Sequence, residues 1–220
     1  SMKSRLLLSL VFLLLFSTYK IQNNFNLSNY FSIDEILIEN NKILNSTEIK
    51  NEFSFLYEKN LFFLKNKNIK KKLKQNSFVD SFEIKKIYPN KIIIKIFEKK
   101  PVAILQNKRK KYYFTDKGEV IKFLELKKYN DLPIVFGDKV SFSIFYENLK
   151  KMNFPTNKIK SFYFFESNRW DLVTTKNQTV KLPSNNYLES LNNFLRLEID
   201  QNFEKYKIFD YRINNQLILK

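Results

Sequence analysis

The order of apolar and polar residues predicts a small β-α-α-β-β unit over residues 33–98. A strand is expected over 33–38, and a helix is expected to start at Asn45, which is a good N-cap with Glu48 three residues later. A second helix over 68–75 and two strands over 82–88 and 91–98, joined by Pro89-Asn90, complete the unit. The helical stripes expected to face the sheet consist of Ile49, Phe53 and Leu56 in the first helix and Ile69 and Leu73 in the second.

From residue 101 onward the pattern favours β-structure with two helices. Short strands are expected over 102–105, 112–115, 119–121, 159–165, 170–174, 179–182, 207–213 and 216–220. Leu132–Gly137 is an apolar crossing segment, and Asn214-Asn215 suits a tight hairpin between the last two strands. The two helices are expected over 141–152, with Phe142, Phe145, Leu149 and Met152 inward, and over 185–197, with Leu188, Leu191 and Leu195 inward.

The N-terminal apolar run LLLSLVFLLLF, from Leu6 to Phe16, is either a membrane anchor or a signal peptide. The apolar run is short, which is typical of a signal peptide. No small-x-small cleavage site follows it, however, and Lys3, Arg5 and Lys20 could reach the headgroups from a helix that continues to Ile21. The anchor is therefore favoured, and the basic residues ahead of it predict a cytoplasmic N-terminus with the bulk of the chain periplasmic.

The predicted fold class is α+β: one N-terminal transmembrane helix, then the β-α-α-β-β domain, then a mainly antiparallel β-domain with two helices. The expected parts are residues 1–5 as a short cytoplasmic tail, 6–21 as the anchor, 22–32 as a linker, 33–100 as the first domain and 101–220 as the β-domain.

Composition excludes most enzyme and cofactor classes. The chain of 220 residues has no His, no Cys and two Gly, which removes Ser-His and Cys-His nucleophile pairs, zinc sites built on those residues, disulfides and glycine-rich phosphate loops. Carboxylate pairs such as Asp34/Glu35 and Glu119/Glu125 are not brought into one cleft by any pattern. We expect no enzyme activity, no cofactor, no metal and no small-molecule substrate.

The net charge of +17 has two explanations. Nucleic-acid binding is one, and the basic cluster Lys108–Lys111 beside Tyr112, Tyr113 and Phe114 fits it. The bias of an AT-rich genome toward Lys, Asn, Ile and Phe codons is the other, and it is favoured because the chain is also rich in Asn, Ile and Phe and has a single Ala. Behind a membrane anchor the basic cluster would not meet nucleic acid, and it is expected to be a solvated hairpin loop. No nucleic-acid partner is therefore expected.

Five segments in order resemble the FtsQ/DivIB family of bacterial cell-division proteins. They are Gln75–Leu105 with its Tyr-Pro-Asn and Pro-Val-Ala motifs, Tyr112–Ile121 with an Asp-x-Gly turn, Leu132–Gly137, Arg169–Pro183 with Arg-Trp-Asp-Leu, and Ile208–Lys220. Tyr211 departs from the family's usual Leu, Asn177 stands where Gly is common, and the cytoplasmic tail is shorter than usual. The resemblance implies that the first domain is a POTRA domain.

The resemblance also implies a non-catalytic scaffold of the division complex at the septum of the inner membrane. Its POTRA domain would help recruitment, and its β-domain would bind the FtsB–FtsL pair. A last strand at a sheet edge could add a partner strand. The candidate partner-binding residues are Arg212, Ile213, Asn214, Gln216, Leu217, Ile218 and Leu219. For each apolar residue the alternative is a contact with the core alone, and for Arg212 it is an internal ion pair with Asp210 or Asp171.

Two other function classes remain open. One is a POTRA-containing outer-membrane assembly or secretion factor, although only one such unit is found in the sequence. The other is a secreted basic protein that binds cell-wall polymers, which a processed N-terminus would favour.

Overall fold

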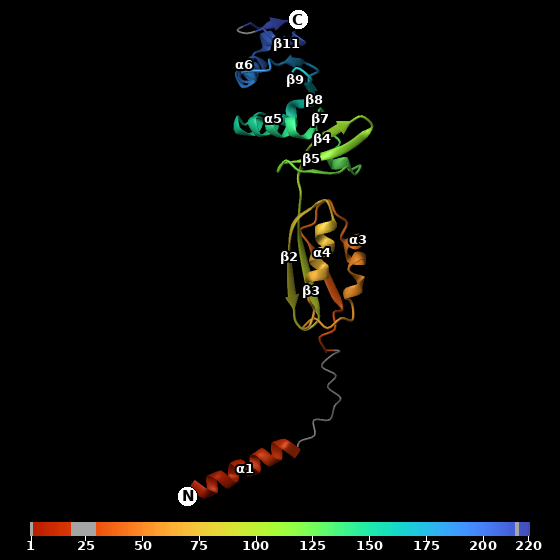
Figure 1. Ribbon diagram of the computed structural model, residues 1–220, viewed down its shortest axis with the longest axis vertical. Coiled ribbons are helices and arrows are strands. Elements are labelled where there is room, and N and C mark those ends of the chain that lie inside the picture. Colours follow the sequence, from red (N-terminus) through yellow and green to blue (C-terminus); the bar gives the residue numbers. More distant parts are fainter. Residues whose placement is uncertain (1, 19–29, 214–215) are drawn as a thin grey trace. The chain divides into compact units, whose positions relative to one another are not determined.

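The computed structural model describes residues 2–18, 30–213 and 216–220. The chain divides into two compact units. The first consists of Ser1–Gln75 and Ser81–Phe97, and the second of Asn76–Asp80 and Glu98–Lys220. Figure 1 follows both units from red to blue along the chain.

Helix α1 (Met2–Thr18) holds the apolar run, and its side chains from Leu6 to Phe16 are exposed. Among the described residues, none of the helices has the length and apolar character needed to cross a bilayer. The anchor expected over residues 6–21 extends to residues 19–21, which lie outside the described part of the chain.

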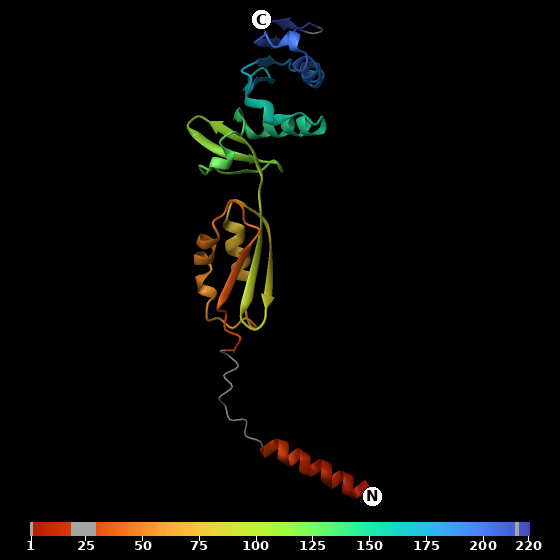
Figure 2. The same ribbon diagram turned by 180° about the vertical axis from the view of Figure 1, so that it is seen from behind.

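The first unit is a three-stranded sheet in the order β1-β3-β2, with helices α3 and α4 on one face (Figures 1 and 2). Its strands are β1 (Glu35–Glu39), β2 (Val79–Ile87) and β3 (Lys91–Glu98), and β1 runs parallel to β3. Its helices are α3 (Ser46–Glu52), the 3-10 turn η1 (Ser54–Leu56) and α4 (Lys67–Gln75). This confirms the predicted β-α-α-β-β order.

The core of the first unit forms where the helical stripes meet alternate residues of β3. Ile92, Ile94 and Ile96 are fully buried. The predicted helical residues are also buried, and they are Ile49, Phe53, Leu56, Ile69 and Leu73. Asn45 caps α3 as expected, because its side chain accepts a hydrogen bond from the Thr47 N–H at 2.8 Å.

The second unit is one nine-stranded sheet in the order β12-β11-β10-β9-β8-β7-β4-β5-β6. Its strands are β4 (Pro101–Asn107), β5 (Lys110–Thr115), β6 (Val120–Lys122), β7 (Ile134–Phe136), β8 (Ile159–Phe165), β9 (Arg169–Thr174), β10 (Thr179–Lys181), β11 (Ile208–Asp210) and β12 (Ile218–Leu219). The pairs β4–β7, β7–β8 and β10–β11 are parallel, and the other five neighbouring pairs are antiparallel. The sheet is therefore mainly antiparallel, as predicted.

Helices α5 (Lys139–Lys151) and α6 (Tyr187–Ile199) pack on this sheet through aromatic side chains. Phe145 of α5 stacks on Trp170 of β9 at 4.8 Å, and Phe194 of α6 meets Phe209 of β11 edge-on at 5.1 Å. Trp170 is 5% exposed, so it belongs to the core. The short 3-10 turns of the second unit are η2 (Lys127–Tyr129), η3 (Thr156–Lys158) and η4 (Gln201–Phe203).

One prediction for the helices of the second unit is wrong. Leu188 was expected to face inward but is 38% exposed. Tyr187 packs against the core instead, and its ring is 5.3 Å from that of Phe145. It shares a helix face with the buried Leu191, which lies four residues later. The crossing segment Leu132–Gly137 contains a true interior strand, β7, which lies between β4 and β8.

The last two strands are shorter than the predicted 207–213 and 216–220. The pairing of β11 with β12 ends at Asp210. Beyond it, the Arg212 N–H donates a hydrogen bond to the Asp210 carboxylate at 3.1 Å. The Tyr211 N–H donates to the Lys181 carbonyl at 2.9 Å. The expected Asn214-Asn215 hairpin turn lies outside the described residues.

A candidate partner-binding edge

Strand β12 forms one end of the nine-stranded sheet. It pairs antiparallel with β11, with Leu219 opposite Phe209 and Ile218 opposite Asp210. Within residues 2–18, 30–213 and 216–220, no strand lies on its other side. The sheet edge that the sequence analysis singled out is thus open in the described chain.

The hydrogen bonds of Lys220 define which backbone groups of β12 point outward. Lys220 exchanges two hydrogen bonds with Ile208, at 3.0 and 3.1 Å. Hydrogen-bonded and non-hydrogen-bonded pairs alternate along an antiparallel ladder, so the next pair, Leu219 with Phe209, is non-hydrogen-bonded. The N–H and C=O of Leu219 therefore point away from β11, toward the open side.

Side chains of the last residues alternate between the core and the opposite face. Leu217 and Leu219 pack against the main apolar core. Ile218 is 36% exposed and Ile213 is 51% exposed. Of the apolar candidates, Ile213 and Ile218 are thus the ones accessible to a partner, while Leu217 and Leu219 supply core contacts and backbone.

A row of charges crosses the sheet toward Ile218. Asp171 of β9 lies opposite Lys181 of β10, which lies opposite Asp210 of β11, which in turn lies opposite Ile218. Signs alternate along this row, which is favourable for cross-strand neighbours. A strand added beside β12 would extend this row by one position.

Arg212 forms an ion pair with Asp210. Its Nε and Nη2 donate to the two carboxylate oxygens at 2.8 and 2.6 Å. The bonds from Arg212 hold the pKa of Asp210 below its ordinary value, and they raise the pKa of the guanidinium. The Arg212 side chain is still 42% exposed, so a second carboxylate can approach it.

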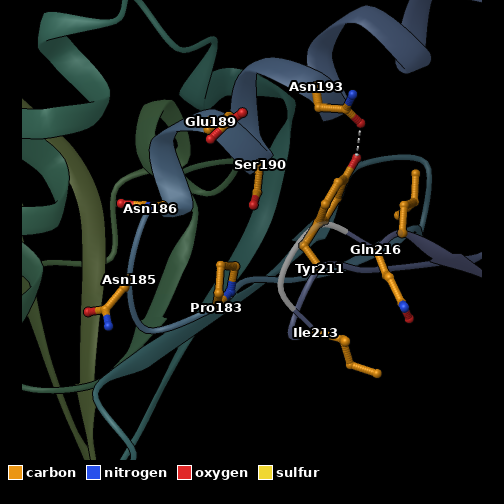
Figure 3. A pocket seen from close by; sticks show the side chains of 10 residues that line it. Pro183, Asn185, Asn186, Glu189, Ser190, Asn193, Tyr211, Ile213 and Gln216 are labelled. Atoms are coloured by element: carbon orange, nitrogen blue, oxygen red, sulfur yellow. Dashed lines mark hydrogen bonds between the residues drawn. The ribbon is translucent and has the colours of Figure 1, made fainter.

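A cavity of about 570 Å³ opens beside this edge (Figure 3). The terminal segment supplies one wall, and the start of α6 with the loop before it supplies the other. Its lining residues are Pro183, Asn185, Asn186, Glu189, Ser190, Asn193, Tyr211, Ile213, Gln216 and Leu217. Four of these carry side-chain amides, so the cavity is rich in hydrogen-bond donors and acceptors.

Tyr211 fixes the terminal segment to α6. Its hydroxyl donates to Asn193 Oδ1 at 2.8 Å, drawn as a dashed line in Figure 3. The ring is 8% exposed, and burial raises the pKa of the hydroxyl. This bond holds the two walls of the cavity together.

The cavity brings together three predicted candidates, Ile213, Gln216 and Leu217, whereas Asn214 lies outside the described residues. The partner-binding role of all the candidates stays a prediction. Sequence reasoning missed the α6 wall, which includes Asn186, Glu189 and Asn193. Their polarity fits an ordinary solvated helix face, and no local pattern shows that the chain end returns beside them.

Two family models match the chain. Residues 31–99 match the model described as POTRA domain, FtsQ-type, and residues 103–212 match the one described as cell division protein FtsQ/DivIB, C-terminal. Cell division protein FtsQ of Rickettsia conorii is 25% identical over 199 residues, which cover 86% of this chain and 72% of the relative. That of Rickettsia typhi is 26% identical over 198 residues, covering 86% and 73%.

Among solved structures, one neighbour is the major extracytoplasmic domain of the trans isomer of the cell-division protein DivIB from Geobacillus stearothermophilus. It has a TM-score of 0.35 and 10% identity, and the match covers 48% of this chain and 96% of that one. The two family models match residues 31–99 and then 103–212, and they confirm the resemblance drawn from the motifs. The chain belongs to the FtsQ/DivIB family of bacterial cell-division proteins.

Proposed function

We propose that the protein is a non-catalytic, single-pass scaffold of the division complex that captures the FtsB–FtsL pair at β12. The observation that carries the proposal is the open edge of the nine-stranded sheet, where the N–H and C=O of Leu219 point outward. A partner segment in extended form would bond these groups and become a tenth strand.

Affinity and specificity have separate sources in this mechanism. Ladder hydrogen bonds contribute affinity for any extended segment, whereas neighbouring side chains select the partner. Ile218 and Ile213 offer apolar contacts, and Arg212 offers a charge-assisted bond to a partner carboxylate. The amide-rich cavity beside the edge suits a polar side chain or a turn of the partner.

The N-terminal run supports membrane attachment within the same proposal. Eleven consecutive residues from Leu6 to Phe16 carry no charge, and basic residues precede them. We expect the N-terminus in the cytoplasm and both folded units in the periplasm, at the septum of the inner membrane. The FtsQ-type family models favour this function over an outer-membrane assembly factor or a cell-wall binder.

The test compares two substitutions at one position, with the full chain in detergent and FtsB–FtsL as bait. Leu219→Pro deletes the outward N–H and puts a ring where the partner's carbonyl would lie, while Leu219→Ala keeps that donor and removes a similar amount of core contact. We expect Leu219→Pro to weaken capture by at least about tenfold relative to Leu219→Ala.

Thermal unfolding of both variants serves as the control for the fold. Equal capture of FtsB–FtsL by Leu219→Pro and Leu219→Ala would refute strand addition at β12. Absence of capture by the unmodified chain would refute the partner itself.

A further inference from the structure

One end of the first unit carries an aromatic end patch, which consists of Tyr30, Phe31, Phe62, Phe63 and Tyr88. Phe63 is 77% exposed, Phe62 and Tyr30 are each 61% exposed, and Tyr88 is 52% exposed. Figure 1 shows the chain entering the first unit at the same end as the turn between β2 and β3, which holds Tyr88. So much exposed aromatic surface in one place indicates an interaction site.

The rings of the patch are held in place by contacts with one another and by the loop that carries them. Phe31 contacts Phe62 at 6.2 Å and Tyr88 at 6.0 Å between ring centroids, and Phe62 contacts Tyr88 at 6.4 Å. Asn60 Oδ1 accepts hydrogen bonds from the backbone N–H groups of Phe62 and Phe63 at 2.9 and 3.4 Å. Leu61, which is fully buried, anchors the same loop in the core. The rings are therefore held outward by a fixed loop.

Lysines border the patch on the side of Phe63. Lys59 and Lys65 border the shallow depression that also contains Phe63, and both are exposed. Between Lys59 and Val79 the sequence holds no acidic residue, and its lysines are Lys59, Lys65, Lys67, Lys70, Lys71, Lys72 and Lys74.

Two of the three carboxylates near this end already have polar or basic partners, so they offset little of the lysine charge. Asp34 accepts a hydrogen bond from Asn90 at 2.6 Å, and Glu35 pairs with Lys91 at 2.8 Å. Glu58, which precedes the patch loop, is exposed. A net positive rim therefore remains around the rings.

Aromatic side chains with a lysine rim match the chemistry of a bilayer interface. Aromatic rings favour the headgroup level, and lysines near the surface are attracted to anionic lipids. Only eleven residues separate Thr18 from Tyr30, which fully extended span at most about 40 Å. Such a tether gives the patch an effective concentration at the membrane in about the millimolar range, so weak docking suffices.

We propose that the aromatic end patch docks on an anionic lipid surface and holds the first unit against the membrane. The inference rests on the N-terminal anchor of the proposed function. Docking would restrict the angle at which this unit rises from the bilayer.

The absence of Cys from the chain makes a site-specific probe simple. Asn68→Cys places an environment-sensitive fluorophore beside Phe63, and Gln75→Cys places it on the same face of α4 about 10 Å farther along. The full chain is reconstituted into vesicles of phosphatidylcholine and phosphatidylglycerol that contain a doxyl-labelled lipid as quencher. Flotation first measures whether the chain is in the membrane.

We expect at least about twofold stronger quenching at position 68 than at position 75, because an interfacial surface reaches about 5–10 Å into the headgroup region. The double substitution Phe62→Ser and Phe63→Ser should reduce quenching at 68 to the level at 75. Ile144→Ser, at a residue that is 62% exposed in the second unit, is the matched control and should leave it unchanged. Vesicles of phosphatidylcholine alone should show weaker quenching at 68.

Each other outcome overturns the inference. A chain that floats but shows equal, weak quenching at both positions keeps its anchor and lacks lipid docking. Disulfide-linked dimers of the unlabelled Asn68→Cys chain, together with weak quenching of the labelled chain, identify a second copy as the occupant. A chain that does not float refutes the anchor, and the docking with it.

Discussion

Asparagine holds backbone positions that glycine commonly takes. Among the described residues with positive φ are five asparagines, with φ between 52° and 63°: Asn40, Asn153, Asn168, Asn177 and Asn186. Asn tolerates this left-handed region better than most side chains. Asn177, singled out from the sequence as a substitute for a turn glycine, has φ 58°. Turns in this chain could therefore be predicted from Asn, although not their number.

Gly137 shows the opposite case, a glycine required by close packing. A Cβ there would lie 2.9 Å from Phe164 Cβ and 3.2 Å from Trp170 Cη2. Gly137→Ala is expected to lower the free energy of unfolding by about 1–3 kcal/mol, because the added methyl group would overpack the site against Phe164 and Trp170. Urea unfolding measures the loss, and an unchanged midpoint would contradict the close approach.

Asp171 should make stability fall as pH rises. Burial raises its pKa above the ordinary value, against the opposing effect of Arg169 at 3.5 Å. The folded state thus binds the proton more tightly than the unfolded state, and the unfolded state gains as pH rises through the ordinary pKa of about 4. The change in the free energy of unfolding that Asp171→Asn causes, relative to the unmodified chain, is expected to be more favourable at pH 7 than at pH 4.

Denaturant unfolding at both pH values measures this difference. Asp210 is the internal comparison, because its pKa is lowered and its contribution to stability is lost as pH falls. A pH-independent effect of Asp171→Asn would show that burial does not penalise the Asp171 charge.

At the scale of elements, the existence of most helices and strands was predictable, and their ends were not. Helix α5 was expected from residue 141 but begins at Lys139, because Asp138 caps it with Oδ1 accepting from the N–H groups of Val140 and Ser141, each at 2.9 Å. Ser141 stands where a capping box would have Glu or Gln, so the start signal was weak. Apolar spacing locates the middle of a helix better than its cap.

The Asp138 cap should be measurable on its own. The hydrogen bonds from Ser141, its side chain first, and from Val140 lower the pKa of Asp138. Asp138→Ala is expected to cost about 1 kcal/mol at pH 7, and the cost should shrink as pH falls through the lowered pKa and the carboxylate is protonated in both states. Asp138→Asn, which keeps a capping oxygen, is the control. An equal loss in both variants would argue against the side-chain cap.

At the scale of the whole molecule, the sheet order could not be predicted. Hairpin neighbours such as β8 and β9 follow from turn residues, but the parallel pairs join segments that are distant in the chain. Strands β5 and β6 lie between β4 and β7, α5 lies between β7 and β8, and α6 lies between β10 and β11. Nothing local encodes such pairing. The cavity beside β12 depends on that long-range order, which is why only its terminal wall was among the predicted residues.

The full chain is expected to keep its N-terminus in the membrane fraction. No small-x-small site follows Phe16, so a signal peptidase finds no preferred bond. Intact mass spectrometry of the extracted protein should give the uncleaved mass. A product shorter by roughly 15–30 residues would favour the secreted alternative.

The short length of β12 makes the protein selective for its binding partners. An edge strand of two residues offers too few ladder hydrogen bonds to bind an arbitrary extended peptide. For the same reason it limits edge-to-edge aggregation of the protein itself. A true partner must add contacts at Ile213, Ile218 or the neighbouring cavity before it is retained. A longer strand at this edge would thus be expected to bind extended segments more strongly and with less specificity.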